Sequence, residues 1–450
     1  MSLSEPTSNT RPLSSPALQD KSPASMPRIN TASHSQYFLL LLTVIFALQY
    51  LDRQIVVILA EPLKQEFGMS DAMLGLLAGL VFSVPYALML LPVGYLVDRL
   101  NRRNLLAAAL SLWSFLTVLT GLSRTLIEVM LCRAAIAASE SVNNPAALSM
   151  LADRYSKRNR ASAIGVYYAG PAIATILGFT LIGMIADRFG WRAAFFSAGV
   201  PGILLAILLF LSTREPQRED TPSDSTSKQS APPLKETFRF MFSQRSLCHM
   251  ALGFMLSTFV AMGQIAWLSP LLMRSHGLSL VSAAVAISLA FGLALALGQI
   301  LGGFIVDRLA KHNIGWTLWF PVLCALISCA AMIGSAASPY AWLTIVLLAC
   351  WALPHGCLSG PIIGTAQSLV MPRMRGVTNS CMALMTNLIG AGLGPLAVGV
   401  LSDGFSDLGN KSIVAALITI AIFQLWATCH YLIAARTLKK DLARAEIAPT

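Results

Sequence analysis

Four charged residues lie inside two otherwise apolar stretches of the chain, and their types could carry proton and anion chemistry. Asp52 and Arg53 are adjacent in the first stretch, while Arg133 and Glu140 share a later one. A charge at the centre of a bilayer costs about 3 kcal/mol, so such residues persist only with a partner or beside a water-filled cavity. Two acids and two bases therefore predict a neutral cluster between the two stretches, with a purely structural buried network as the alternative.

This cluster predicts a site where carboxyl groups exchange protons and guanidinium groups attract an anion. Burial and a nearby arginine act in opposite directions on a carboxyl group, so we expect Asp52 and Glu140 to couple protons. Arg133, Glu140 and Asn144 are spaced so that they share one helix face. A lone histidine in an apolar helix is more often a packing residue than a site residue. The residues expected to bind substrate are Arg53, Arg133, Asn144, Tyr50, Tyr168, His355 and Asn387.

Charged loops between the apolar stretches predict a gate rather than a binding site. The loop GYLVDRLNRRN covers 94–104 and has a weaker echo, GGFIVDRLAKHN, at 302–313. Asp153 is the acid expected near Arg102 and Arg103, either as a latch in one conformation or as a solvated pair of little energy. Charge that only sets topology is the alternative for these loops. The expected gating residues are Gly94, Asp98, Arg99, Arg102, Arg103, Asp153, Asp307 and Arg308.

Composition indicates that membrane helices position these residues. Of the 450 residues, 55% are hydrophobic and 12% charged, against about 25% charged in soluble domains. The net charge of +11 could suggest nucleic acid, but Lys and Arg lie in short loops, so we expect a lipid bilayer and no nucleic acid. Spans of roughly 20 apolar residues are expected near 37–61, 73–98, 104–122, 126–152, 161–186, 194–213, 247–272, 281–307, 316–336, 341–368, 376–402 and 412–435.

A polar segment divides these twelve spans into two sets of six. Residues 214–245 predict a cytoplasmic linker between an N-terminal bundle, 37–213, and a C-terminal bundle, 246–436. Residues 1–36 predict a disordered cytoplasmic tail and 437–450 a second tail. Counted over loops and tails, Lys and Arg number 24 on the side of both termini and 6 on the other. This bias predicts cytoplasmic termini and an inner or plasma membrane location.

The pattern Gly-x-x-x-Asp ends spans two, five, eight and eleven, the same place in each of four three-helix units. Small residues let membrane helices approach closely, and nested repeats of three and six helices are typical of secondary transporters. The repeat predicts an all-α membrane fold of two pseudo-symmetric six-helix bundles around a midplane cavity. The four pairs are Gly94/Asp98, Gly183/Asp187, Gly303/Asp307 and Gly399/Asp403.

These motifs resemble the major facilitator superfamily, and within it the spinster-like subfamily. The loop at 94–104 and its echo resemble the superfamily signature. YLDRQIVVILAEPLKQEFGMSDAMLGLLAG (50–79), the Arg133 to Glu140 spacing, GWRAAFFSAGVPG (190–202) and NLIGAGLGPLAVGVLSD (387–403) are similar to the subfamily. The resemblance implies the major facilitator fold, proton exchange at the span-one and span-four acids, and arginines that meet an anionic head group. Span four departs from the subfamily, because ASES and NNP replace its glycine-rich surroundings and make a more polar wall.

We therefore expect a proton-coupled secondary transporter that moves an organic anion or an amphiphilic, lipid-like molecule by alternating access. One alternative is an organic-acid symporter of the anion:cation group, which also carries a span-one Asp-Arg pair. The other is a membrane sensor without transport. No nucleophile and base pair, metal-ligand spacing or phosphate loop stands out, so we expect no enzyme activity, cofactor or metal. The expected partners are the substrate, the coupling proton and lipid, for a chain that acts as a monomer.

Overall fold

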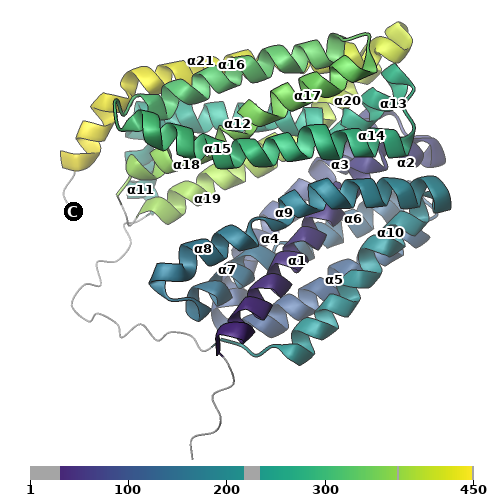
Figure 1. Cartoon of the computed structure of the whole chain (residues 1–450), viewed down its shortest axis with the longest axis horizontal. Coiled ribbons are helices and arrows are strands. Elements are labelled where there is room, and N and C mark those ends of the chain that lie inside the picture. Colours follow the sequence, from purple (N-terminus) through teal and green to yellow (C-terminus); the bar gives the residue numbers. More distant parts are fainter. Residues whose placement is uncertain (1–30, 217–233, 372–373, 448–450) are drawn as a thin grey trace, which may run out of the picture.

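The computed structural model describes residues 31–216, 234–371 and 374–447, and these residues form helices without strands (Figure 1). Most of the predicted first tail and of the predicted linker lies outside the described residues. The N-terminal half contains α1 (Thr31–Ile58), α2 (Ala60–Phe67), α3 (Asp71–Ala78), α4 (Leu80–Arg99), α5 (Arg102–Leu122), α6 (Leu126–Glu140), α7 (Asn143–Arg154), α8 (Lys157–Tyr167), α9 (Gly170–Ile173), η1 (Ala174–Gly178) and α10 (Phe179–Ser212).

The C-terminal half contains the remaining helices, among which η2 and η4, like η1, are π-helical, and η5 is a 3-10 helix. They are α11 (Leu234–Ser243), α12 (Arg245–Ala266), α13 (Leu268–His276), α14 (Leu280–Ala286), η2 (Ile287–Gly292), α15 (Leu293–Ala310), α16 (Trp316–Ala337), α17 (Ala341–Gly356), α18 (Ser359–Ser368), α19 (Arg375–Met385), η4 (Thr386–Leu393), α20 (Gly394–Gly404), η5 (Ser406–Lys411) and α21 (Ser412–Ile447).

These helices make up twelve membrane spans. Ten stretches of the described residues are long and apolar enough to cross a membrane. One of them, Ser162–Ser212, turns at Gly190, where a φ of 81° interrupts the helix, and therefore holds two spans. The twelfth span is α6 followed by α7, two helices of 15 and 12 residues that are separated by a short break.

The helices extend beyond three predicted boundaries. α1 begins at Thr31, inside the predicted tail, and α11 forms inside the predicted linker. α21 continues to Ile447 rather than ending near 436. The extension of α21 has a packing reason, because Leu438 is buried and Asp441 accepts a hydrogen bond from the first turn of α12.

Interruptions of the spans recur at equivalent places in the two halves. Spans one and seven break near their ends, at Leu59 and Trp267, and spans four and ten break between α6 and α7 and between α17 and α18. Spans five and eleven contain η1 and η4, and span eight contains η2 where span two bends at Gly79. Matching interruptions in equivalent helices support the predicted pseudo-symmetry, because internal repeats place equivalent features in equivalent helices. π-helical turns are also frequent at functional sites.

The two halves meet at one end of the bundle. We call the end where α10 stops and α12 starts the linker end, and the opposite one the far end. Figure 1 shows the halves meeting around α2, α3, α13 and α14 and diverging toward α8, α11 and α19. One buried apolar cluster includes residues of both halves, such as Leu63 and Leu271, whereas two further clusters each belong to one half. The described conformation is therefore closed at the far end.

Glycines of the Gly-x-x-x-Asp pattern differ between the two ends. A β-carbon on Gly399 would clash with the backbone of α3, and one on Gly183 would meet a side chain of α14. No atom lies within 4 Å of the place that a β-carbon would take on Gly94 or Gly303. Two of the four copies thus serve close packing between the halves at the far end, while the two at the linker end face open space.

Candidate functional site

The four charged residues of spans one and four come together between α1 and α6. Arg133 is 3% exposed and donates from Nη1 to the carbonyl oxygen of Asp52 at 3.0 Å and from Nη2 to that of Arg53 at 2.5 Å. Its guanidinium also lies 4.6 Å from the centre of the Phe82 ring. Helical carbonyl oxygens keep a second lone pair that can accept such bonds. Arg133 therefore holds the backbone of α1 rather than a carboxylate.

The two carboxyl groups of this cluster are not ion-paired in the described part of the chain. Asp52 accepts one hydrogen bond, from the hydroxyl of Thr117 at 2.5 Å, and its other oxygen has no partner. Glu140 is fully buried, and neither of its carboxyl oxygens has a hydrogen-bond partner. The neutral cluster predicted from the sequence thus exists as four neighbouring charges, but without the direct acid–base pairs that a neutral cluster suggests.

Polar groups around the break between α6 and α7 fix this region to α1. The amide of Gln49 donates to the backbone carbonyl of Glu140 at 2.9 Å, and the amide of Asn143 donates to Gln49 at 2.5 Å. Gln49 lies one helical turn before Asp52, so one face of α1 carries both the amide and the acid. The predicted site did not include Gln49, Asn143 or Thr117, although their place in apolar spans beside the charges was a usable signal.

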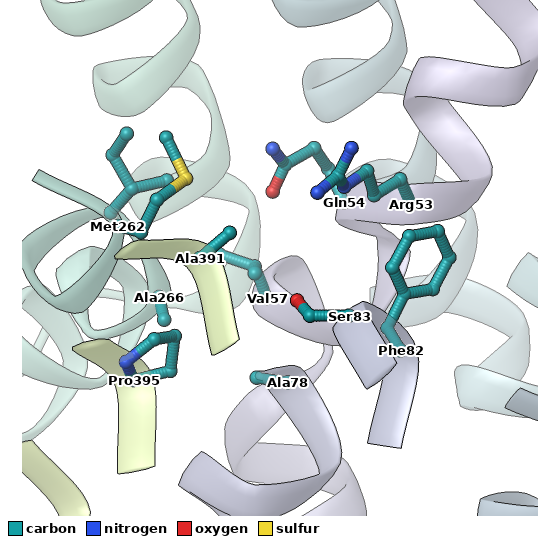
Figure 2. A pocket seen from close by; sticks show the side chains of 11 residues that line it. Arg53, Gln54, Val57, Ala78, Phe82, Ser83, Met262, Ala266, Ala391 and Pro395 are labelled. Atoms are coloured by element: carbon teal, nitrogen blue, oxygen red, sulfur yellow. The ribbon is translucent and has the colours of Figure 1, made fainter. Parts of the chain in front are cut away.

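Arg53 reaches from the N-terminal half toward the C-terminal half. Its guanidinium lies 4.8 Å from the Phe82 ring centre and 5.6 Å from that of Tyr86, and Nη2 is 3.4 Å from Oδ1 of Asn387 in η4. A small pocket of about 30 Å³ lies beside it between the halves, large enough for water only (Figure 2). The opposite wall of this pocket is apolar and consists of Met262, Ile265, Ala266, Ala391 and Pro395.

The remaining predicted binding residues are more dispersed. Asn144 accepts a hydrogen bond from Tyr167 at 2.8 Å, beyond the helix break, so it does not continue the face of Arg133 and Glu140. Tyr168 is 50% exposed and Tyr50 half-buried on the same half. His355 lies beside Trp351 in the C-terminal half, with 6.1 Å between ring centres.

The predicted gating residues at the linker end form contacts within the N-terminal half. Arg102 is buried and binds Asp153 at 2.5 Å and Glu215 at 2.6 Å. Arg103 bonds instead to the backbone carbonyls of Phe210 and Thr213 at the end of α10. The predicted latch therefore joins α5 to α7 and to the end of α10, and does not bridge the two halves.

The other predicted gating residues lie on the surface of the linker end. The guanidinium carbon of Arg99 lies 4.1 Å from the centre of the Tyr95 ring, and Asp98 is exposed at the end of α4. Asp307 and Arg308 are exposed in the equivalent place on α15 and line a surface hollow with Lys311.

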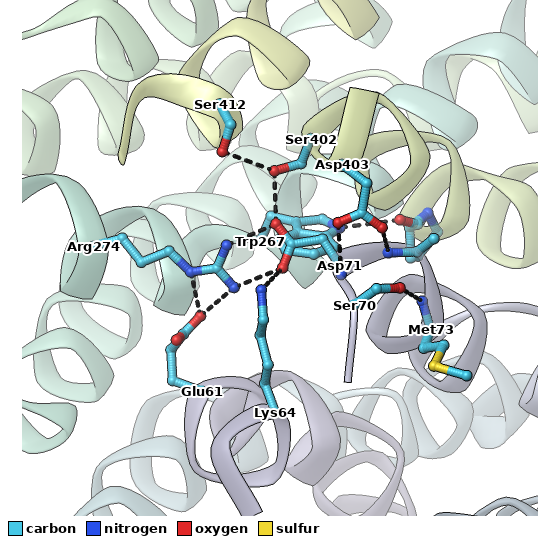
Figure 3. A network of polar contacts seen from close by, with 12 residues as sticks. Glu61, Lys64, Ser70, Asp71, Met73, Trp267, Arg274, Ser402, Asp403 and Ser412 are labelled. Atoms are coloured by element: carbon cyan, nitrogen blue, oxygen red, sulfur yellow. Dashed lines mark hydrogen bonds and ion pairs between the residues drawn. The ribbon is translucent and has the colours of Figure 1, made fainter. Parts of the chain in front are cut away.

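A polar network that was not predicted from the sequence joins the halves at the far end (Figure 3). Arg274 of α13 binds Asp71 of α3 through two bonds of 2.7 and 2.9 Å, and binds Glu61 of α2 at 2.5 Å. Lys64 lies in the same half as Asp71 and pairs with its carboxylate. The hydroxyl of Ser402 in α20 donates to the Asp71 carboxylate at 2.6 Å. The side chain of Asp71 is 4% exposed and that of Arg274 16% exposed.

Asp403 completes this far-end network as a helix cap. Its carboxylate accepts the backbone N–H groups of Asp71 and Ala72 at 3.0 and 2.8 Å, where the positive end of the α3 dipole favours an anion. Burial by itself lowers the pKa of the Arg274 guanidinium, but its hydrogen bonds to Asp71 and Glu61 leave that pKa above the usual value. Opening the far end would have to separate these partners.

Comparison with known proteins gives four similarities. The sequence model of the Major Facilitator Superfamily matches residues 42–395. A solved bacterial homologue of the human lysosomal transporter spinster, in an inward-facing and unoccupied conformation, aligns with a TM-score of 0.82 and 30% identity over 91% of this chain and 98% of that one. An MFS-type efflux pump of Mycolicibacterium smegmatis is 30% identical over 88% of this chain and 91% of the pump. The hexuronate transporter of Bacillus subtilis is 24% identical over 85% of this chain and 91% of that protein.

Proposed function

Because the chain belongs to the Major Facilitator Superfamily, we propose that it is a proton-coupled secondary transporter of an amphiphilic organic anion. The observation that carries this proposal is the set of four charges between α1 and α6, whose arginines bind backbone and aromatic rings rather than carboxylates. Cations that form no direct ion pair in a low-dielectric site attract an anion strongly.

Arg53 is the residue best placed to meet the substrate. Its one hydrogen bond across the halves, to Asn387, is long at 3.4 Å, so an anionic group could replace it at little cost. The wall opposite Arg53 is formed by apolar residues of α12, η4 and α20. A charged head group beside α1 and an apolar body against the C-terminal half would satisfy both walls, which favours an amphiphile over a fully polar acid.

The proposed proton sites are Glu140 and Asp52. An ionised carboxylate that is fully buried without hydrogen bonds costs several kcal/mol, so Glu140 is favoured in its neutral form in this conformation. Release of that proton would return a negative charge next to Arg133 and change how strongly the cluster holds an anion. The ionised carboxylate of Glu140 and the substrate anion would then compete for the same arginine, so that a bound proton favours a bound anion, which is sufficient to couple them.

The proposed cycle alternates between this conformation and one open at the far end. The positive charge at the linker end suggests that this end faces the cytoplasm, so the described conformation corresponds to an inward-facing one. The far-end network would close the outer side, while Asp98, Arg99, Asp307 and Arg308 would act at the linker end in the other conformation. The chain would act as a monomer in the inner or plasma membrane.

A second candidate is an organic-acid symporter. The similarity to a hexuronate transporter favours it, and the polar surroundings of Glu140 suit a sugar acid. The apolar wall opposite Arg53 argues against an organic-acid symporter, because the hydroxyl groups of a sugar acid would have no hydrogen-bond partners there. A substrate comparison separates the two candidates directly.

The test is uptake into proteoliposomes that contain the purified protein and carry an imposed pH gradient. Three radiolabelled classes are compared: single-chain anionic amphiphiles, hexuronates, and neutral amphiphiles. We expect accumulation of an anionic amphiphile that stops when an ionophore collapses the gradient. Accumulation that survives collapse of the gradient would contradict proton coupling, and uptake of hexuronates alone would favour the second candidate.

A further inference from the structure

The short helix α11 occupies the boundary between the linker and the first span of the C-terminal half. It has 10 residues, too few to cross a bilayer, and ends at Ser243, two residues before α12 begins a membrane span at Arg245. Figure 1 shows it at the linker end beside α19. Its position on the chain therefore holds it at the level where lipid head groups meet acyl chains.

Two faces of α11 are chemically distinct. Phe240 and Met241 pack against the apolar cluster of the C-terminal half, and Thr237 is buried with them. Phe238 and Phe242, one turn apart, are 39% and 75% exposed. Exposed aromatic side chains of this size on a helix that packs on its other side need another apolar partner.

Basic residues border the exposed aromatic face. Lys235 and Arg239 are also one turn apart, are exposed, and lie about 60° and 100° around the helix from Phe238. Glu236 is exposed about 160° from Phe238, on the side away from the aromatic pair. A helix with an apolar stripe, two cations along one edge of that stripe and an acid farther around is suited to lie in a membrane surface with its aromatic rings immersed and its cations among the head groups.

We propose that α11 is a membrane-surface helix that inserts Phe238 and Phe242 into the linker-side leaflet and binds anionic lipid head groups through Lys235 and Arg239. Because α11 also contacts α19, which starts span eleven, this helix connects the lipid surface to a helix that must move when the linker end closes. The proposal depends on the position of α12 and not on the identity of the transported substrate.

The test places a nitroxide label at single cysteines of the full-length protein in lipid nanodiscs. Positions 238 and 242 report the proposed buried face, and position 236 on the same helix is the matched control. Collision with oxygen is compared with collision with a water-soluble nickel complex. We expect labels at 238 and 242 to collide with nickel at least five times less than the label at 236. Equal nickel accessibility at all three positions would overturn the proposal.

A second measurement tests the head-group chemistry. Nanodiscs of phosphatidylcholine are compared with nanodiscs containing phosphatidylglycerol, and inorganic phosphate is added to the neutral discs as the soluble source of the same chemistry. We expect only phosphatidylglycerol to deepen the label at 242, and the Lys235→Gln/Arg239→Gln variant to lose this response. The same depth in both lipids, or a response that survives in the variant, would contradict the anionic-lipid part.

Discussion

The distinctive residue of the site is Arg133, because its guanidinium is buried yet bonded to carbonyl oxygens rather than to an acid. Two hydrogen bonds to the backbone at Asp52 and Arg53 and the stacking on Phe82 fix its plane. Carbonyl oxygens orient the group without cancelling its charge. The field of Arg133 therefore remains available to the proposed substrate anion and to the nearby carboxyl of Glu140.

We expect Arg133→Lys to lose most of the transport rate although the charge is retained. An ammonium group is a single point charge and cannot reach two carbonyl oxygens in a fixed fork while packing over an aromatic ring. The expected loss is about tenfold or more in uptake efficiency, which corresponds to about 1.4 kcal/mol. The matched control is Arg192→Lys, at an exposed pair with Glu66, which should transport normally. Full activity of Arg133→Lys would show that only charge matters at this position.

Glu140→Gln separates coupling from binding. The substitution fixes a neutral side chain of similar shape at a buried site without hydrogen-bond partners, so it imitates the protonated form. Uptake driven by a pH gradient should fall to background, while counterflow of substrate between loaded and external pools continues. Glu128→Gln, at the exposed start of the same helix, is the control and should retain both activities. Gradient-driven uptake that survives in both Glu140→Gln and Asp52→Asn would place coupling elsewhere, with His355 the next candidate.

Among the elements, the interrupted spans are the features that place the site and permit movement. The break between α6 and α7 exposes the carbonyl of Glu140 to Gln49, and the bend at Gly79 brings α4 beside η4. The far-end network then connects α2 and α3 to α13 and α20. Its net formal charge is −1, from three acids and two bases, and the N-terminus of α3 compensates the acid that caps it.

We expect Arg274→Gln to shift the conformational equilibrium toward a state open at the far end. The substitution leaves Asp71 and Glu61 without their cationic partner in the other half, and breaking a largely buried pair is more costly than losing an exposed one. A shift of about tenfold in population is expected. Spin labels at Met73 and Leu408, both exposed at the far end, would report it as a new longer distance. Lys64→Gln touches the same carboxylate from within one half and should leave the distances unchanged.

The sequence predicted the elements better than the contacts between them. Hydropathy and the Gly-x-x-x-Asp repeat were sufficient for twelve spans in two halves, because both signals are local or periodic. The far-end network escaped prediction because Glu61, Lys64 and Asp71 read as ordinary loop charges, and only folding brings Arg274 to them from some 200 residues away. The partners of Arg133 escaped for a different reason, since backbone carbonyls carry no sequence signal.

At the scale of the whole molecule, two of the four copies of the Gly-x-x-x-Asp repeat lie at the closed far end and two lie at the open linker end. Gly183 and Gly399 pack against the opposite half at the far end, whereas Gly94 and Gly303 have free space at the linker end. Pseudo-symmetry suggests that the second pair packs in the same way when the linker end closes. Alternation would then exchange one pair of close contacts for the other, with the charged cluster of α1 and α6 near the pivot.

This exchange predicts opposite effects of the same small substitution at the two ends. Gly399→Ala and Gly94→Ala both replace a helical glycine and gain similar helix propensity, up to about 1 kcal/mol. Gly399→Ala would clash with α3 in the described conformation, and should therefore populate the state open at the far end. Gly94→Ala meets nothing here and should trap this conformation by obstructing closure of the linker end. Distances between spin labels at the two ends would measure both shifts, and a shift in the same direction for both variants would refute the alternation of the two pairs.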